Sequence, residues 1–346
     1  MATLVGMDAR TLAGNALTLP RFVQTVRAAR HFDRARPTPH TTDGASKYRM
    51  RSVMDLDPRI GKAISKLAIK DPGTVAWQTA DPTTSRFVDA GEIDSAVTGL
   101  RSDGFYVFQQ VVDSTLVNTI RGYAEQAPCH PRGVEGPPVT YPRSAPEVGR
   151  YDLYEEVALG SPEVQEFATD PAMAVIAQQY LGQPVLMDEV AFWWTTNRRA
   201  EDASLNAQMF HQDRDRLSFL KFFIYLTDVT PDTGPHVYVR GSHRSIPWSL
   251  RADGRITDEA VQRAGLGHEI KELSGPAGTL LAVDTIGLHK GKTPVTGDRL
   301  ALENEFATSL FGMDYERPSF TPTELTRDRY MRMPWVLQRY RDAVTG

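Results

Sequence analysis

Four segments in the second half of the chain carry the apolar patterns expected of buried β-strands. They are residues 185–197, 219–229, 279–284 and 299–311. Successive side chains of a strand point to opposite faces. Residues 219–229 therefore place Leu220, Phe222 and Ile224 on a wholly apolar face and Lys221 and Tyr225 on the other. This contrast predicts a sheet with one face in a hydrophobic core and the other turned toward a more polar interior.

The first 98 residues show a different periodicity. Apolar side chains recur at helical spacing in residues 19–32 and 57–71, whereas residues 36–48 between them are rich in Pro, Thr and Gly and predict a loop. We therefore expect residues 1–98 to form a helical extension that packs on the core or against a partner subunit in a homodimer. Residues 99–346 would form the main domain, with a helical segment at its carboxyl end.

The start of this main domain has clear local signals. Residues 104–110 predict a strand, and Asp113 or Ser114 is a suitable cap for the helix that follows. Residues 128–152 are rich in Pro and Gly, which indicates a long loop that either covers the site as a lid or is a simple surface excursion. Residues 162–182 predict two short helices separated near a Pro and ended by Gly.

Composition narrows the class of protein. The hydrophobic fraction of 41% supports a full core, and the net charge of −4 gives no reason to expect nucleic acid as a partner. The chain has one cysteine, Cys129, which excludes an intramolecular disulfide and suits a reducing cytoplasm. No stretch has the apolar length of a membrane span. We expect a cytoplasmic protein that acts on a small molecule.

Candidate chemistry is concentrated between residues 211 and 299. His211 and Asp213 stand two residues apart, so a strand would direct both side chains to one side, and His289 and Arg299 follow later in the chain. Two imidazoles and one carboxylate can occupy one face of Fe(II) and leave the other face open. The guanidinium of Arg299 suits the distal carboxylate of a cosubstrate such as 2-oxoglutarate.

These residues lie in sequence blocks that resemble the phytanoyl-CoA dioxygenase-like family of Fe(II)- and 2-oxoglutarate-dependent oxygenases. The matching blocks read HQD, YLTDVTPDTGP, RGSHR and GLHKGKTPVTGDRLALENEF, and DGFYVFQQVVDSTLVNTIR resembles the opening of the family's domain. The resemblance runs from about residue 100 to 312. The family usually has Pro where this chain has Arg240, a minor departure.

The resemblance implies a fold and a set of site residues. The fold is mainly β with flanking helices, built on a double-stranded β-helix (jelly-roll, cupin-like) core. His211, Asp213 and His289 would be the metal ligands and catalytic residues, and His243, a competing candidate, would belong to a structural loop. Beside Arg299, the predicted cosubstrate-binding residues are Lys221, Tyr225 and Gln208, and the predicted substrate-binding residues are Trp193 and Arg150.

The implied reaction uses O2 and 2-oxoglutarate, releases succinate and CO2, and oxidises a C–H bond of a small metabolite. Related halogenating enzymes carry a small residue in place of the metal-binding carboxylate, so Asp213 favours hydroxylation. Two alternatives remain: a metal-dependent jelly-roll enzyme that does not use 2-oxoglutarate, and a non-catalytic binding protein of the same fold. Arg299 argues against the first, and the intact set of ligands argues against the second.

Overall fold

The computed structural model describes residues 18–35, 42–57, 59–69, 73–198, 207–251 and 254–346. Two antiparallel sheets form its centre, an eight-stranded sheet of order β1-β9-β6-β11-β5-β4-β2-β3 and a three-stranded sheet of order β10-β7-β8. The strands are β1 Phe105–Val107, β2 Pro128–Pro131, β3 Val139–Thr140, β4 Arg150–Leu153, β5 Leu186–Thr195, β6 Phe219–Tyr225, β7 His236–Val239, β8 Ile270–Leu273, β9 Leu280–Val283, β10 His289–Gly291 and β11 Arg299–Ala307. The protein is thus mainly antiparallel sheet with flanking helices.

Helices surround the sheets. The α-helices are α2 Thr18–Ala35, α3 Gly44–Met54, α4 Ile60–Ala68, α5 Ile93–Asp103, α6 Ser114–Gln126, α7 Glu155–Ala158, α8 Pro162–Ala168, α9 Pro171–Leu181, α10 Asp258–Arg263, α11 Glu324–Arg332 and α12 Arg341–Thr345. Short 3-10 turns are η2 Thr74–Trp77, η3 Pro82–Thr84, η4 Ala90–Glu92, η5 Trp248–Leu250, η6 Gly267–Glu269 and η7 Gln338–Tyr340. The side chain of Asp113 caps α6, as predicted, and Gly182 ends α9 in the left-handed conformation at φ 65°.

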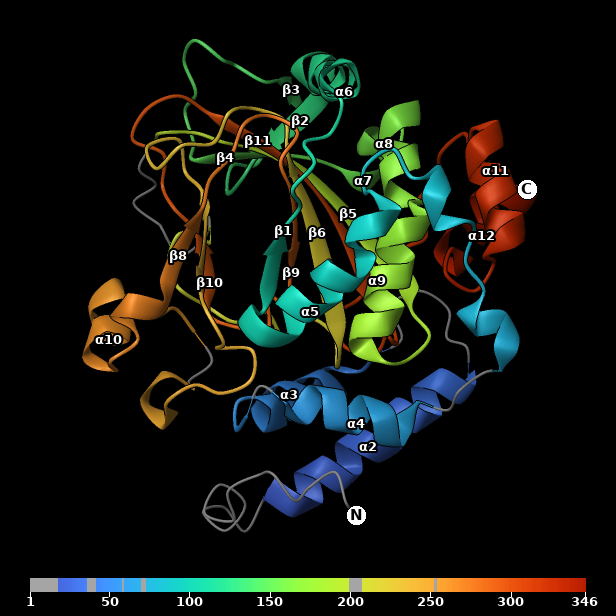
Figure 1. The fold of residues 1–346 in the computed structure, drawn as a ribbon. Helices are drawn as coiled ribbons and strands as arrows, with labels where there is room; N and C mark the ends of the chain where they lie inside the picture. Colours follow the sequence, from blue (N-terminus) through green and yellow to red (C-terminus); the bar gives the residue numbers. More distant parts are fainter. Residues whose placement is uncertain (1–17, 36–41, 58, 70–72, 199–206, 252–253) are drawn as a thin grey trace.

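The large sheet separates a helical layer from the small sheet. Figure 1 shows α5, α8 and α9 against one face, with β8 and β10 on the other side and α10 beyond them. Phe192, Trp194 and Phe222 pack in the core on the helical side. Trp193 and Phe223, each one residue along from a member of that set, belong to the cluster between the sheets. Strand alternation therefore predicted the two faces of β6. In the structure, the face of Phe222 packs against the helices and the face of Phe223 lies between the two sheets.

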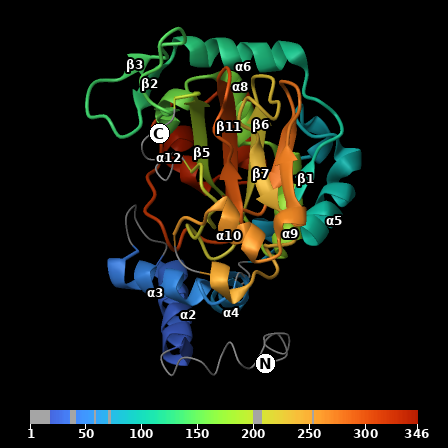
Figure 2. The same ribbon diagram turned by 90° about the vertical axis from the view of Figure 1, so that its left-hand side faces the viewer.

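Helices α2, α3 and α4 pack beneath one end of the large sheet (Figures 1 and 2). Ile60 and Ile64 of α4 share a buried cluster with Leu217 and Phe219. The contact is close, because a Cβ added to Gly61 would lie 2.2 Å from the carbonyl oxygen of Leu217. The buried apolar side chains of α4 are thus covered in part by the end of the large sheet of the same chain.

Two segments that were expected to be loops, residues 36–48 and 128–152, contain regular elements in the structure. Within the expected loop 36–48, residues from Gly44 onward belong to α3, whose N-cap Asp43 accepts a hydrogen bond from Ser46 N, and residues 36–41 lie outside the described part. The expected loop 128–152 contains β2, β3 and β4, which extend the large sheet at its edge. Two prolines of this region, Pro128 and Pro131, are the first and last residues of β2, and each is paired with only one neighbouring strand. Within the described residues, no helix combines the length and apolar character needed to cross a membrane.

Candidate metal centre

The backbone brings His211 and His289 together although 78 positions separate them (289 − 211). The two residues form an isolated antiparallel bridge, in which each backbone N–H donates to the other's carbonyl at 3.0 Å. Two residues further on, the N–H of Asp213 donates to the carbonyl of Thr285 at 2.9 Å. Residues 211–213 do not form a regular strand, contrary to expectation. These backbone bonds nevertheless hold the side chains of His211 and Asp213 on the same side, as a strand would.

The three side chains converge on one point. Nε2 of His211 lies 3.6 Å from Oδ1 of Asp213, and Nε2 of His289 lies 3.6 Å from Oδ2 of Asp213. One potential ligand atom from each residue lies within 4.8 Å of the others. Metal–ligand bonds of about 2.1 Å place neighbouring ligand atoms about 3 Å apart, so a modest adjustment suits a single ion. The predicted metal ligands are therefore assembled in a geometry that could hold a metal.

Hydrogen bonds orient both imidazoles with Nε2 toward this point. Nδ1 of His211 lies 2.9 Å from the carbonyl oxygen of Met209, and Nδ1 of His289 lies 3.0 Å from that of Gly287. A carbonyl can only accept, so each Nδ1 carries the proton and each Nε2 keeps its lone pair for a ligand bond. Burial, followed by the neighbouring His289, lowers the pKa of His211 to about 3, and burial also lowers the pKa of His289.

We expect the imidazole of His211 to stay neutral in the metal-free protein at pH 5.5. A pKa of about 3 means that the ring is protonated only at a much more acidic pH than an ordinary histidine. Long-range 1H–15N correlation spectra at pH 5.5 should show His211 as the neutral tautomer protonated at Nδ1. A doubly protonated His211 ring at this pH would contradict the tautomer assignment.

Lys221 is surrounded by carboxylates, not by an open binding position. Its Nζ lies 3.2 Å from Asp213 Oδ2, 3.1 Å from Glu303 Oε1 and 3.3 Å from Glu305 Oε2. Burial acts to lower the pKa of Lys221, but these carboxylates outweigh it and raise the pKa well above its usual range. Burial likewise acts to raise the pKa of Asp213, and Lys221 with the two histidines holds it well below its usual range. The contacts thus place Lys221 beside Asp213, and its cosubstrate role stays a prediction.

Replacement of Lys221 by Met should destabilise the fold. It would leave Glu303, Glu305 and Asp213 buried without their shared cation, a loss that costs about 3–5 kcal/mol in similar cases. Urea unfolding of the metal-free protein measures this change. Lys292→Met removes a partly exposed ion pair with Glu272 and should cost no more than about 1 kcal/mol. Equal effects of the two substitutions would contradict a special role for Lys221.

A salt bridge to a buried carboxylate anchors the segment that holds Asp213. Asp284 is fully buried beside Thr285, and its Oδ2 accepts from Lys62 Nζ at 2.7 Å and from Tyr180 Oη at 2.5 Å. Lys62 belongs to α4 and Tyr180 to α9. Helices from two regions of the chain therefore stabilise the turn whose carbonyl accepts the N–H of Asp213.

Arg299 lies at the start of β11, buried, with unused hydrogen-bonding capacity. Its Nη1 donates to the carbonyl of Gly234, its Nη2 donates to Thr195 Oγ1 at 3.2 Å, and its Nε is buried without a partner. Burial lowers the pKa of Arg299. Gln208 Nε2 is likewise buried without a partner. Such orphaned donors are the groups that a bound carboxylate would satisfy.

The hydroxyl of Tyr225, a predicted cosubstrate-binding residue, makes two hydrogen bonds within the protein. It donates to the carbonyl of Leu273 at 2.8 Å and accepts from the N–H of His236 at 3.0 Å. Its single proton is already donated, so direct donation to a cosubstrate, as predicted, would require this bond to break. Tyr225 thus joins β6 to the small sheet.

The predicted substrate residues lie side by side on neighbouring strands. The guanidinium carbon of Arg150 is 4.2 Å from the ring centroid of Trp193, and Arg150 Nε donates to Asp152 Oδ1 at 2.7 Å. Burial, partly offset by Asp152, lowers the pKa of Arg150 to about 10. Trp193 pairs with Ala301, whose other partner in the sheet is Tyr225. The pair therefore belongs to the inner face that also carries Arg299.

His236 was missed by the sequence predictions. It opens β7, and its ring stacks on that of His289 at a centroid distance of 5.4 Å and an interplanar angle of 1°. The turn sequence TGP directly before it does not show to which face its side chain points. The alternation of Val237 and Val239 could have shown it. These two valines pack on the outer side of the small sheet, so His236 points to the inner side. His243, by contrast, lies outside the triad, with Nε2 3.3 Å from Arg101 O.

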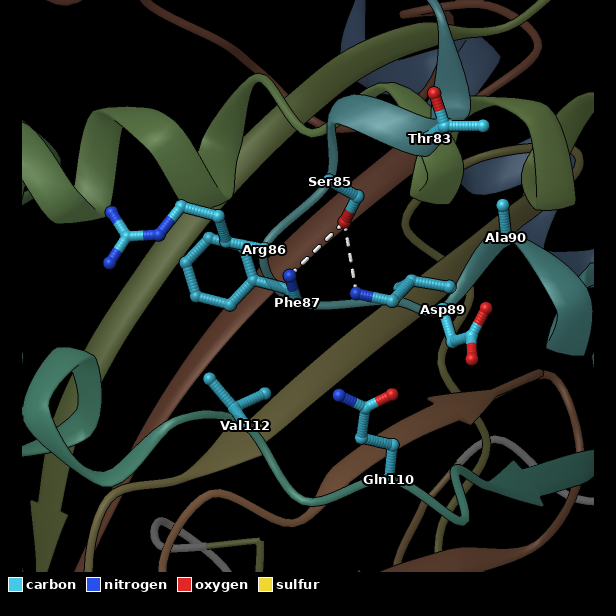
Figure 3. Close-up of a pocket in the computed structure, with 9 residues that line it drawn as sticks. Thr83, Ser85, Arg86, Phe87, Asp89, Ala90, Gln110 and Val112 are labelled. Atoms are coloured by element: carbon cyan, nitrogen blue, oxygen red, sulfur yellow. Dashed lines mark hydrogen bonds between the residues drawn. The ribbon is translucent and has the colours of Figure 1, made fainter.

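A cavity of about 310 Å³ lies elsewhere, between the segment 83–90 and the residues that follow β1. The Ser85 hydroxyl accepts from the N–H groups of Phe87 and Val88 at 3.1 and 2.9 Å, and Figure 3 shows it turned toward Phe87. The same hydroxyl donates to Asp170, and Arg86 is paired with Glu166. The polar groups of this cavity thus serve the fold, and its residues are separate from the triad.

Comparison with known proteins identifies the family. Residues 100–299, more than half of the chain, match the family model described as phytanoyl-CoA dioxygenase. The chain belongs to this family of oxygenases, which confirms the resemblance seen in its motifs. No curated protein sequence matches the chain.

Several solved structures are similar at low identity. AviO1 from Streptomyces viridochromogenes Tue57 is 19% identical with a TM-score of 0.42, covering 62% of this chain and 94% of that one. HygX from Streptomyces hygroscopicus, solved with nickel, 2-oxoglutarate and hygromycin B, is 19% identical with a TM-score of 0.43, covering 63% and 88%. EctD from S. alaskensis in its apoform is 16% identical with a TM-score of 0.46, covering 78% and 92%.

Proposed function

We propose that the protein is an Fe(II)- and 2-oxoglutarate-dependent dioxygenase that hydroxylates a C–H bond of a small-molecule metabolite. The observation that carries this proposal is the convergence of His211, Asp213 and His289, supported by family membership. Two neutral imidazoles and one carboxylate are the donor set of non-heme Fe(II) oxygenases. The orphaned Nε of Arg299 fits the other requirement, an anionic cosubstrate.

Each site residue has a separate proposed role. His211, Asp213 and His289 would hold Fe(II), which when bound with 2-oxoglutarate supplies the activation of O2. Lys221 keeps Asp213 ionised as a ligand. Arg299 neutralises the distal carboxylate of 2-oxoglutarate, and Gln208 provides a further donor. Trp193 and Arg150 border the substrate.

We further propose that the two sheets form the double-stranded β-helix of the sequence prediction. The bridge between His211 and His289 joins the metal-binding segment to the small sheet, and Lys221 joins it to the large one. Residues 1–98 would be an extension on a single oxygenase domain of residues 99–346, since the cluster around Ile64 and Phe219 is shared between them.

The proposal is tested by turnover of 2-oxoglutarate. Protein supplied with Fe(II), O2 and 2-oxoglutarate should release succinate slowly without substrate and faster when the correct metabolite is added from a screen. Protein that neither binds 2-oxoglutarate under anaerobic conditions nor forms succinate would contradict the proposal. Metal binding without 2-oxoglutarate binding would favour the alternative, a metal-dependent enzyme that uses no oxoacid.

A further inference from the structure

His236 occupies a position between the metal-binding triad and Arg299. On the triad side its ring lies parallel to that of His289, with centroids 5.4 Å apart, and the ring of Phe223 lies 5.2 Å away. On the other side, Arg299 Nη1 donates to the carbonyl of Gly234, two residues before His236 in the chain. The backbone N–H of His236 donates to Tyr225 Oη at 3.0 Å, which fixes its place at the start of β7.

The neighbouring strand leaves space beside this ring. His236 pairs with Gly291 of β10, and paired residues of an antiparallel sheet present their side chains on the same face. Gly291 has no side chain, and a Cβ built on it would lie 3.2 Å from Arg299 Nη2. The guanidinium of Arg299 therefore approaches the strand beside His236 where a larger residue would obstruct it.

The ring nitrogen of His236 lacks a partner. The residue is only 7% exposed, and its Nε2 is buried without a hydrogen-bond partner. A buried polar atom left unpaired is unfavourable, so a site that retains one is expected to receive a ligand or a water there. A neutral histidine ring carries one N–H, which can donate a hydrogen bond to an acceptor placed beside it.

We propose that His236 is a further cosubstrate-positioning residue, whose Nε2–H donates a hydrogen bond to a carboxylate of 2-oxoglutarate bound between Arg299 and the triad. This inference rests on the proposed function, because it requires an anionic cosubstrate in that position. An anion fits there because Arg299 brings a full positive charge, and the ring N–H of His236 adds a directional hydrogen bond. Phe223 supplies the apolar wall against which the ligand's carbon chain would lie.

Three substitutions separate this role from simple packing. His236→Phe keeps an aromatic ring beside His289 but removes the donor, whereas His236→Gln keeps a donor. His268→Phe is the matched control, since the side chain of His268 is 74% exposed. Each protein is loaded with Mn(II), which avoids turnover, and titrated with 2-oxoglutarate by calorimetry. A separate titration gives the Mn(II) affinity, and circular dichroism establishes folding.

The Phe variant should bind 2-oxoglutarate about 10- to 100-fold more weakly, as expected for loss of one hydrogen bond to a charged group. The Gln variant should remain within about threefold to fivefold of the parent, the His268 control should be unchanged, and Mn(II) affinity should be preserved in all.

Unchanged 2-oxoglutarate binding in the Phe variant would overturn this assignment alone. Equal losses in the Phe and Gln variants, or loss of Mn(II) affinity, would also overturn it. Absence of 2-oxoglutarate binding by the parent would overturn the proposed function as well. If the Phe variant does not fold, His236→Leu replaces it with the same expected outcomes.

Discussion

Replacement of Asp213 by Ala should reduce Fe(II) affinity by at least about 100-fold and abolish 2-oxoglutarate turnover. Loss of residues that merely support a metal ligand typically costs 10–100-fold in affinity, and Asp213 is proposed to be a ligand itself. It is also the only anionic member of the triad. The remaining pair of neutral imidazoles would then have to bind a dication without charge compensation. Anaerobic titration with Fe(II), together with a succinate assay, measures both effects.

Asp215→Ala is the matched control for this change. Asp215 lies two residues along and also faces Lys221, with Oδ2 4.0 Å from Nζ, but it is not part of the triad. Its removal should change Fe(II) affinity by no more than a few-fold. Similar losses in the two variants would show that general negative charge near Lys221, and not ligation by Asp213, determines metal binding.

Replacement of Arg299 by Met should raise the Kd for 2-oxoglutarate by about 100- to 1000-fold. A hydrogen bond to a charged group contributes about 1.5–3 kcal/mol, and a guanidinium can make two to one carboxylate. Fe(II) affinity should change little, because the hydrogen bonds of Arg299 go to Gly234 and Thr195 and not to the triad. Calorimetric titration of the metal-loaded variant with 2-oxoglutarate provides the measurement.

Arg299→Lys distinguishes charge from geometry. Lysine keeps the positive charge but cannot present two parallel N–H groups, so an intermediate loss is expected. The thermal stability of each variant must be measured, since Arg299 is buried and its removal leaves the Gly234 carbonyl without this donor. A Met variant that is folded and binds 2-oxoglutarate as tightly as the parent would exclude Arg299 from the cosubstrate site.

Much of the sheet and the triad followed from the sequence because the signals were local or were carried by family motifs. The alternation in β6 separated Phe222 from Phe223 correctly, and the cap at Asp113 marked the start of α6. The convergence of His211 with His289 could not be predicted from local signals. It depends on a long-range backbone bridge that periodicity does not specify, and only the resemblance to the family motifs predicted it.

The residues that could not be predicted depend on pairing register and on tertiary contacts. Lys221 meets Glu305 because β6 and β11 pair in that register, which no single strand encodes. The orphaned nitrogen of His236 becomes visible only when its neighbours are placed. Helix α3 has weak amphipathic character and is stabilised by packing of Met50 and Val53 against the rest of the protein, which the Thr- and Gly-containing sequence before it concealed.

The central claim is that His211, Asp213 and His289 bind one ferrous ion. Its most direct test is anomalous diffraction at the iron edge from crystals grown anaerobically with Fe(II). The account predicts one strong peak within about 2.0–2.2 Å of both Nε2 atoms and of an Asp213 carboxylate oxygen. A peak bound by other residues, or well-ordered side chains of this triad with no metal between them at saturating Fe(II), would contradict it.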